Sequence, residues 1–437
     1  MKLKKGQKID LGSNRVLLVE DFLGAGGQGE VYLAKVDGRQ LALKIYINKP
    51  SRDFIFNLKN NINKKSPSVN FLWPLEFVEV DDNTVGYLME LRPKHYDSFI
   101  SFLNGKVKFK DTRTLINWCI QLCMSFKKLH EKGFSYQDLN DGSFFLDPTN
   151  GALLICDNDN VAADKKNLGI LGKMKYMAPE IVRGDTHPTT GYKILPDIHS
   201  DRFSLAVILF MALCLGNPFE GERLKTYDII DEVAEYELYG KSPIFVYHKT
   251  NKSNRPIRGY HTSVLKRWAY LPIYIKEAFH KTFVDGLEDR ENKRVVEIEW
   301  IKLLAKYRDE MITCSCGYQY PYGYEEKSIY DKCPLCNNLS PKVLTLTIGR
   351  NKIKLEPGVY IYKSHIDKYS GEYMLPVGKV IQNKNNPSLW GIKLRLENEI
   401  KIEDSSGKQL IVQKDGVIPL INKLTIYFDD GVIGIIE

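Results

Sequence analysis

The chain of 437 residues has few cysteines, no long apolar run and no large excess of one charge. Its eight cysteines are too few for a disulfide scaffold in a chain of this length. The longest apolar stretch runs only from Phe203 to Gly216, which suits a buried core helix better than a membrane span. No apolar segment follows the basic N-terminus, so we expect no signal peptide. Together these absences predict a cytoplasmic protein with no membrane partner.

The overall composition is that of a globular protein. Hydrophobic residues make up 43% and charged residues 27%, which excludes disorder for most of the chain. At roughly 150 residues per domain, the length predicts two or three domains. The net charge is +8, and residues 239–276 contain no acidic residue. This basic stretch fits either a nucleic-acid surface or an acidic protein partner, and we favour the protein partner.

The hydrophobic pattern changes twice along the chain. Residues 15–90 form short β-rich runs broken by turns such as Asp37-Gly38 and 81–83, which predicts an antiparallel N-terminal lobe. From residue 111 to about 308 the spacing is helical, and the first helix is expected to end at Gly133. After residue 343 the expected strands are VLTLTI, KIKLE, GVYIY, LWGIKLRL, EIKIED, QLIVQ, KLTIYF and GVIGII. The fold class is therefore α+β, with a C-terminal sandwich or barrel.

A glycine-rich segment lies between two of the predicted N-terminal strands. Gly24, Gly26 and Gly29 fall in this segment, and a glycine hairpin between strands favours a loop laid over nucleotide phosphates. Glycines alone most often only make turns. Lys44 follows inside an apolar strand, where it is either an edge lysine that reaches water or a phosphate ligand. Paired with the glycine loop, Lys44 is expected to bind the α- and β-phosphates.

Two acidic loops follow the helical segment that ends near Gly133. Asp138 and Asn140 lie in the first loop, and Asp157 and Asp159 lie in the second. Each could be a solvated turn, but their order and spacing match a catalytic loop followed by a metal loop.

With the Met-Ala-Pro-Glu segment at 177–180, these motifs resemble the eukaryotic-type protein kinase fold from Gly24 to about Ala305. The resemblance implies a bilobal fold, an ATP cofactor with Mg²⁺ or Mn²⁺, and a protein substrate. It implies that Asp138 orients the substrate hydroxyl and that Asp157 holds the metal. The further nucleotide-binding positions that it implies are Val31, Ala42, Met89, Glu90, Leu91 and Phe145.

Several positions depart from the kinase pattern. No glutamate lies between Ile45 and Phe71, so Lys44 must be oriented by another group, with Asp157, Asn57 and Asn60 as candidates. In the catalytic loop, Asn140 takes the place of the usual lysine.

The metal positions also differ from the family pattern. Ser143 replaces the second metal-binding asparagine, and Asp159 is expected to compensate as an extra oxygen ligand. Asn158 stands where a phenylalanine is usual, which removes an apolar link between the lobes. Residues 160–177 contain no serine or threonine, so we expect no activation by phosphorylation of this segment.

Four cysteines form two close pairs in the last third of the chain. Cys314 and Cys316 precede Cys333 and Cys336, a pattern that suits tetrahedral Zn²⁺. Four thiolates fill every coordination position, so the expected zinc is structural. The alternative is four unrelated free cysteines.

The basic stretch, the sequence CDNDN at 156–160 and the cysteine pairs resemble a narrower group of bacterial kinases. These are encoded beside von Willebrand-type and metal-dependent phosphatase proteins in tellurium-resistance-associated triads, so both proteins are expected partners. The resemblance implies a kinase-like domain over 1–310, with lobes at about 1–90 and 91–310. It also implies a zinc ribbon over 311–341 and a forkhead-associated-like β-sandwich over 342–437. The predicted function is a serine/threonine kinase, with a pseudokinase scaffold as the alternative.

Overall fold

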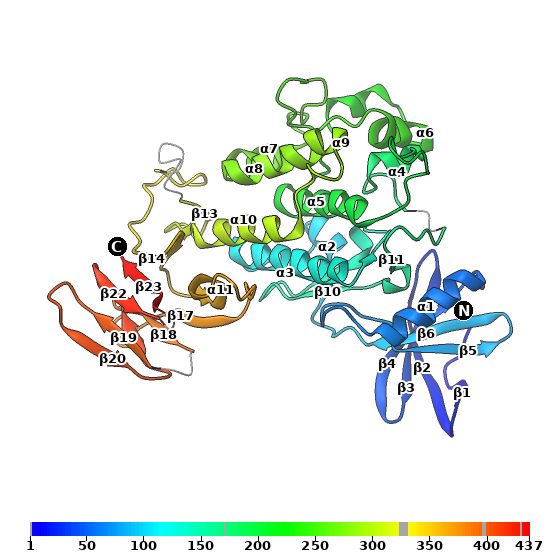
Figure 1. Ribbon diagram of the computed structural model, residues 1–437, viewed down its shortest axis with the longest axis horizontal. Helices are drawn as coiled ribbons and strands as arrows, with labels where there is room; N and C mark the ends of the chain where they lie inside the picture. The colour runs from blue at the N-terminus through cyan, green and yellow to red at the C-terminus, as the bar shows by residue number, and fades with distance from the viewer. Residues whose placement is uncertain (1, 170–171, 323–330, 396–398, 429–430) are drawn as a thin grey trace. The chain divides into compact units, whose positions relative to one another are not determined.

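The computed structural model describes residues 2–169, 172–322, 331–395, 399–428 and 431–437. The chain forms two compact units (Figure 1). The first unit contains Met1–Phe109, Leu122–Leu265 and Phe279–Glu297, and the second contains Lys110–Gln121, Lys266–Ala278 and Ile298–Glu437. Most of the last long helix before residue 310 therefore groups with the C-terminal strands. The domain limits expected from the sequence, at residues 310 and 341, do not coincide with the ends of these units and stay a prediction.

The N-terminal part is a six-stranded antiparallel sheet with the order β1-β2-β3-β4-β6-β5. Its strands are β1 Lys8–Gly12, β2 Arg15–Ala25, β3 Gly29–Val36, β4 Arg39–Tyr46, β5 Glu76–Asp81 and β6 Thr84–Glu90. Asp37 and Gly38 form the turn between β3 and β4 and both have positive φ, as the sequence predicted.

One helix, α1 Arg52–Lys64, lies between β4 and β5 in the chain. Ser51 caps it by accepting a hydrogen bond from the backbone N–H of Phe54, which satisfies one free donor of the first turn. Its buried side chains are Phe54, Asn57, Leu58 and Asn61. Two of these four are amides, so this face of the helix can form hydrogen bonds as well as apolar contacts.

The following segment is mainly helical. Its helices are α2 Phe99–Leu103, α3 Thr112–Glu131, α4 Pro179–Arg183, α5 Ile198–Cys214, α6 Glu232–Glu235, α7 Thr262–Tyr270, α8 Ile273–His280, α9 Gly286–Glu288 and α10 Glu297–Asp309. Its strands are β7 Asp97–Ser98, β8 Phe134–Ser135, β9 Phe144–Leu146, β10 Leu153–Ile155 and β11 Ala162–Ala163. Its short 3₁₀ and π-helical turns are η1 Asp141–Ser143, η2 Asn158–Asn160, η3 Glu222–Thr226, η4 Tyr236–Lys241 and η5 Lys281–Asp285.

Two sequence predictions for this segment are confirmed. Helix α3 ends at Glu131, and Gly133 follows with a φ of 71°, a left-handed conformation that favours glycine. Helix α5 is buried along almost its whole length, which agrees with the buried helix predicted from the apolar run that begins at Phe203. Among the described residues, no helix combines the length and the hydropathy that a membrane crossing requires.

The C-terminal part consists mostly of strands. Its elements are β12 Met311–Thr313, β13 Gln319–Pro321, β14 Thr345–Ile348, β15 Asn351–Lys354, β16 Tyr360–Tyr362, α11 Lys363–Ile366, β17 Pro376–Gln382, β18 Trp390–Leu394, β19 Ile400–Glu403, β20 Gln409–Val412, β21 Val417–Pro419, β22 Leu424–Tyr427 and β23 Ile433–Ile436. Sheets of six and four strands, ordered β15-β14-β23-β22-β19-β20 and β16-β17-β18-β21, share one apolar core. This arrangement agrees with the predicted sandwich.

Strands β17 and β21 were absent from the strands expected by sequence. Strand β17 begins at Pro376 and contains Gly378, two residues that argue against a central strand. A Cβ at Gly378 would lie 2.9 Å from the Ile392 side chain on β18, so close packing between neighbouring strands requires the glycine. Only the three-dimensional packing explains why a glycine stands there.

Gly86 on β6 is a comparable position in the N-terminal sheet and gives a testable prediction. A Cβ at Gly86 would lie 2.0 Å from the Lys44 carbonyl oxygen. We expect Gly86→Ala to lower the free energy of unfolding by about 2 kcal/mol or more, because backbone must shift. The matched control is Gly24→Ala, whose Cβ would meet no atom within 4 Å. Equal denaturant midpoints for the two variants would contradict this packing.

Candidate active site

The glycine loop connects β2 and β3, as the sequence predicted. The Gly26 N–H donates to the Gly29 carbonyl at 2.8 Å and closes the hairpin. A Cβ at Gly24 or Gly26 would meet no atom within 4 Å, whereas one at Gly29 would lie 2.6 Å from the Ile45 carbonyl oxygen. Gly29 is therefore required by the fold, while the open space at Gly24 and Gly26 leaves the loop backbone accessible to a ligand.

Lys44 points inward from β4 and is only 5% exposed. Its ammonium lies 3.0 Å from both carboxylate oxygens of Asp159, 3.2 Å from Asp157 and 3.4 Å from the Gln28 side-chain oxygen. Burial alone lowers the pKa of Lys44, but the charges of Asp159 and Asp157 outweigh it and hold the pKa above its ordinary value. Lys44 is thus a charged, firmly held lysine and not an edge lysine that reaches water.

Asp159 is fully buried in this cluster. Beside the Lys44 contacts, its carboxylate accepts hydrogen bonds from the hydroxyls of Tyr46 at 2.8 Å and Tyr87 at 2.9 Å. The sequence analysis assigned Asp159 to magnesium as a compensating ligand. In the structure both of its oxygens face protein donors, so this arrangement does not offer them to a metal ion.

Sequence analysis did not identify the two tyrosines, although a signal was available. Tyr46 lies two residues after Lys44 on the same face of β4, and Tyr87 is directly opposite Lys44 in the β4–β6 register. Both side chains are buried, and a buried tyrosine hydroxyl needs a hydrogen-bond partner. The partner comes from a loop 72 residues beyond Tyr87, and strand pattern alone does not reveal it.

The metal loop begins at Asp157, whose φ of 54° places it in the left-handed region. Its side chain is 44% exposed, so carboxylate oxygen remains available to a divalent cation. Asn158 is fully buried and donates to the backbone carbonyls of Leu72 and Ile155, each at 2.9 Å. The lost apolar link that we expected at this position is therefore replaced by a polar one.

Helix α1 contacts the same loop through its two buried amides. The side-chain amides of Asn57 and Asn61 each donate to the Val161 carbonyl at 2.7 Å. Among the groups expected to orient Lys44, Asp157 does contact it, whereas Asn57 binds the loop backbone. The helix is thus attached to the metal loop and not to the lysine.

The catalytic loop places Asp138 within the first unit. The Asn140 side-chain amide donates to the Asp138 carboxylate at 3.1 Å, and the Ser143 hydroxyl lies 3.4 Å from the Asp138 carbonyl oxygen. Burial raises the pKa of Asp138, while the Asn140 hydrogen bond lowers it, and the net shift is upward. A carboxylate with a raised pKa is a better proton acceptor than an exposed one.

A buried carboxylate of helix α5 anchors the catalytic loop. The Tyr136 N–H donates to the Asp201 carboxylate at 2.6 Å, and the buried ring of His130 joins Asp201 to Glu297. Burial lowers the pKa of His130, but hydrogen bonds to Asp201 and Glu297 raise it to about 9. Because this pKa leaves His130 protonated at neutral pH, its ring balances part of the negative charge of Asp201 and Glu297.

The remaining positions predicted to bind nucleotide lie on β3, β4, β6 and β9. Val31 is opposite Lys44, and Ala42 is opposite Met89 in the strand register. The guanidinium of Arg92 lies over the Phe145 ring at 4.5 Å. Glu90 is the last residue of β6 and pairs with Arg39 at 2.9 Å, and Leu91 follows it in the chain. The nucleotide-binding roles of these residues stay predictions.

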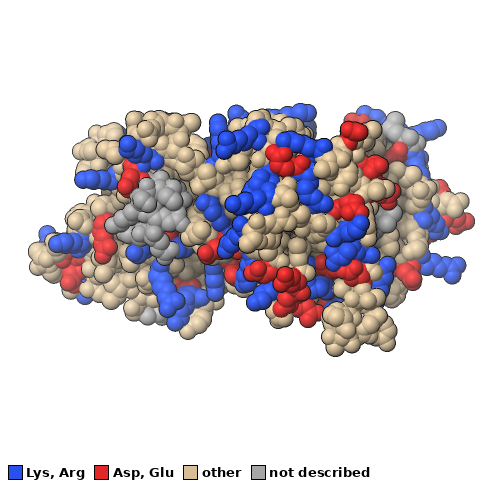
Figure 2. Space-filling model, turned by 90° about the horizontal axis from the view of Figure 1, so that it is seen from above, with Lys and Arg blue, Asp and Glu red and all other residues tan. Residues whose placement is uncertain are grey.

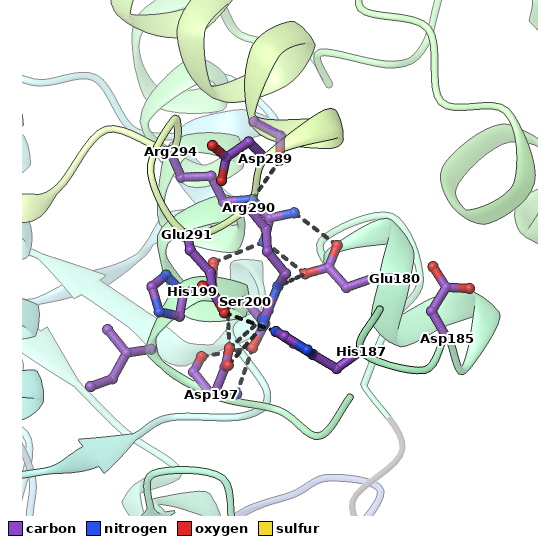
Figure 3. Close-up of polar contacts among 12 residues, drawn as sticks. Glu180, Asp185, His187, Asp197, His199, Ser200, Asp289, Arg290, Glu291 and Arg294 are labelled. Carbon is purple, nitrogen blue, oxygen red and sulfur yellow. Dashed lines mark hydrogen bonds and ion pairs between the residues drawn. The ribbon is translucent and has the colours of Figure 1, made fainter. Parts of the chain in front are cut away.

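A second charged cluster fixes the segment that follows residue 176 (Figure 3). Glu180 pairs with Arg294 at 2.8 Å and with Arg290 at 3.0 Å, and Arg290 also binds Asp197 (Figure 3). Burial alone raises the pKa of Glu180, but Arg294 and then Arg290 lower it to about 2. This cluster joins α4, the start of α5 and the segment before α10.

The four predicted zinc ligands lie together in the second unit. The sulfur atoms of Cys314, Cys316, Cys333 and Cys336 all lie within 4.8 Å of one another. Cys314 is 3.5 Å from Cys336, and Cys316 is 3.7 Å from Cys333. Four thiolates at 2.3 Å from a tetrahedral Zn²⁺ would be about 3.8 Å apart, so the cluster fits this ion. Residues 323–330, between the two pairs, lie outside the described residues.

Comparison with known proteins agrees with the motifs. The family model described as "Protein kinase domain" matches residues 17–284. MAP kinase-interacting serine/threonine-protein kinase 1 of Xenopus tropicalis is 27% identical over 222 residues, covering 47% of this chain and 51% of that protein. Ribosomal protein S6 kinase alpha-6 of Danio rerio is 30% identical over 136 residues, covering 30% of this chain and 16% of that protein. The chain thus spans about half the length of the first and less of the second.

The Glu180 cluster predicts a pH dependence of stability. A pKa lowered from 4.5 to about 2 stabilises the fold fully above about pH 5, and this contribution is lost as the pH falls towards 2. One pKa unit corresponds to about 1.4 kcal/mol, so the contribution is on the order of 3 kcal/mol.

We therefore expect Glu180→Gln to be strongly destabilised at pH 7 and clearly less destabilised near pH 3, where part of the contribution is already lost, measured by urea unfolding at both values. The control is Glu291→Gln, whose side chain is 49% exposed and should have little effect at either pH. A Glu180→Gln deficit that does not change with pH would contradict the predicted ionisation.

Proposed function

The chain belongs to the protein kinase family, and from this premise we propose that it is an ATP- and Mg²⁺-dependent protein serine/threonine kinase. The observation that carries the proposal is the meeting of Lys44, Asp157 and the glycine loop at one site, with Asp138 held nearby on its own loop. These are the groups that phosphoryl transfer requires, since it depends on positioning and charge neutralisation more than on covalent chemistry.

We assign one role to each group. The glycine loop and Lys44 hold the phosphates of ATP, and Met89 to Leu91, with Val31, Ala42 and Phe145, hold the adenine. Asp138 accepts or orients the proton of the substrate hydroxyl, and its raised pKa favours that role. Asn140 steadies the Asp138 carboxylate by the hydrogen bond it donates.

Asp157 is the proposed ligand of Mg²⁺ or Mn²⁺, because its carboxylate is partly exposed beside Lys44. When bound, the ion would neutralise negative charge on the phosphates. Ser143 is a weaker candidate for a second metal, since its hydroxyl is buried against the Asp138 carbonyl.

A pseudokinase scaffold is the alternative function. It is favoured by the absence of glutamate from helix α1 and by the replacement of the catalytic-loop lysine by Asn140. The retained Lys44, Asp138 and Asp157 favour the enzyme. The two proposals differ in whether phosphate is transferred, which a direct assay measures.

We further propose that the C-terminal region recruits protein partners. The Cys₄ cluster would hold structural zinc, and the two packed sheets support a forkhead-associated-like sandwich. The family resemblance suggests a von Willebrand-type protein and a metal-dependent phosphatase of a bacterial tellurium-resistance triad as partners. A reducing compartment such as the cytoplasm suits four zinc-binding thiolates.

An acidic partner surface would fit the basic face of the protein. Figure 2 shows lysine and arginine side chains gathered near the middle of one face. Within the stretch that lacks acidic residues, the exposed cations are Lys241, Lys249, Lys252, Arg258 and Lys266. We favour a protein partner over nucleic acid here, because surface cations of this kind commonly meet an acidic protein surface, although Tyr260 is exposed within the same stretch.

Two substitutions separate catalysis from metal binding. We expect Asp138→Asn to abolish transfer of labelled γ-phosphate while ATP binding is kept, because Asp138 acts only on the substrate hydroxyl. Asp157→Ala should abolish transfer and also weaken Mg²⁺-dependent ATP binding. Phosphate transfer and ATP affinity, the latter from thermal shift, are measured with Mg²⁺ and Mn²⁺. Transfer by neither the native protein nor the variants, with ATP binding intact, would favour the scaffold.

The Cys₄ cluster predicts one zinc ion per chain. We expect Cys316→Ser to lose most of the bound zinc, measured by elemental analysis of the purified protein, because one of four thiolates is removed. Cys156→Ser, at a cysteine outside the cluster, should keep it. Chelation should loosen the region after Thr313 and leave the first unit protected in hydrogen exchange. Equal zinc content in the two variants would rule out this site.

A further inference from the structure

The carboxylate that pairs with Lys44 comes from an unexpected place in the chain. Kinases are expected to orient this strand lysine with a glutamate from the helix that follows it. Here the ion pair is made by Asp159, two residues after the metal-loop residue Asp157. Both Asp159 oxygens lie 3.0 Å from the Lys44 ammonium, and two tyrosine hydroxyls fix the carboxylate from the other side.

Helix α1 provides no carboxylate for this pair. The acid in its first turn, Asp53, is exposed, and the buried helix face carries only Phe54, Asn57, Leu58 and Asn61. The two asparagines donate to the Val161 carbonyl, which follows the metal loop. The helix therefore supports the loop that carries Asp159 and has no charged contact of its own with Lys44 in the described structure.

The two aspartates near Lys44 differ in exposure. The side chain of Asp159 is 0% exposed, whereas that of Asp157 is 44% exposed. A buried ion pair is strongly coupled, because removing one partner leaves an uncompensated charge in a low-dielectric environment. The exposed carboxylate is suited to an ion from solvent, and the buried one is suited to hold the lysine.

We propose that Asp159 is the positioning residue for Lys44 and replaces the missing helix glutamate. This inference rests on the proposed kinase function and adds a regulatory consequence. Because the carboxylate belongs to the metal loop, outward movement of helix α1 would not by itself separate the ion pair. The lysine is pre-positioned whenever the metal loop is in place, so helix α1 acts on the ion pair only through its hydrogen bonds to that loop.

A double-mutant cycle tests the pair without relying on kinase activity. Asp159→Asn and Lys44→Met should each lower the unfolding midpoint, since each leaves one buried charge. The double variant should be more stable than either single variant, because both charges are removed. If Asp159→Asn alone does not fold, the double variant still should. Additive destabilisation of the two substitutions would overturn the proposal.

A second measurement follows the charge on Lys44 itself. The pH dependence of its modification by an amine reagent, read by mass spectrometry, should shift to lower pH in Asp159→Asn. Asp53→Asn, the control at an exposed acid on α1, should not shift it. In the kinase assay, Asp159→Asn should raise the KM for ATP roughly tenfold or more. An unchanged Lys44 profile, with only the Mg²⁺ requirement altered, would identify Asp159 as a metal ligand and reject the positioning role.

The experiments can reject the proposed kinase function and the Lys44–Asp159 ion pair independently of each other. A strong coupling between Lys44 and Asp159 in a protein that transfers no phosphate would keep the ion pair and reject the proposed function. Phosphate transfer in a protein that shows no coupling would keep the function and reject the ion-pair role of Asp159.

Discussion

The buried ion pair between Lys44 and Asp159 is the interaction on which the N-terminal half of the site depends. It connects strand β4 to the metal loop, and the loop is joined to helix α1 through the Val161 carbonyl. Asn158 adds hydrogen bonds from the same loop to Leu72 and Ile155. Sheet, helix and loop are therefore held by one connected set of polar contacts, in which the buried Lys44 ammonium, the Asp159 carboxylate and the asparagine side-chain N–H groups have partners that offset their desolvation.

The catalytic loop has an equivalent electrostatic support on the helical side. Asp201 of α5 accepts hydrogen bonds from the backbone of Tyr136 and pairs with the protonated ring of His130. Because α5 is surrounded by apolar side chains, it provides a rigid base for this contact. The backbone N–H groups of both Tyr136 and Gln137 donate to the Asp201 carboxylate.

The departures from the kinase pattern have one feature in common, which is that each lost contact is replaced by a polar or charged contact from another residue. Asn158 exchanges an apolar contact for hydrogen bonds, the helix carries amides where a carboxylate is expected, and the missing charge reappears at Asp159. Each change taken alone suggests a weakened site. Taken together they keep the positive charge of Lys44 next to the two negative charges of Asp157 and Asp159. The charge balance expected at this site is therefore present, although different residues provide it.

The sequence by itself determined the features whose causes are local. The glycine hairpin, the Asp37-Gly38 turn, the end of α3 at Gly133 and the apolar run of α5 from Phe203 onward follow from residue types within a few positions of one another. The motif order also pointed to Lys44, Asp138, Asp157 and the four cysteines, whose functional roles stay proposals. Only the tertiary structure decided the partner of Lys44, because Asp159 is 115 residues away and no periodicity connects them. Strand β17 was likewise decided by packing, since Gly378 is explained only by the Ile392 side chain on the neighbouring strand.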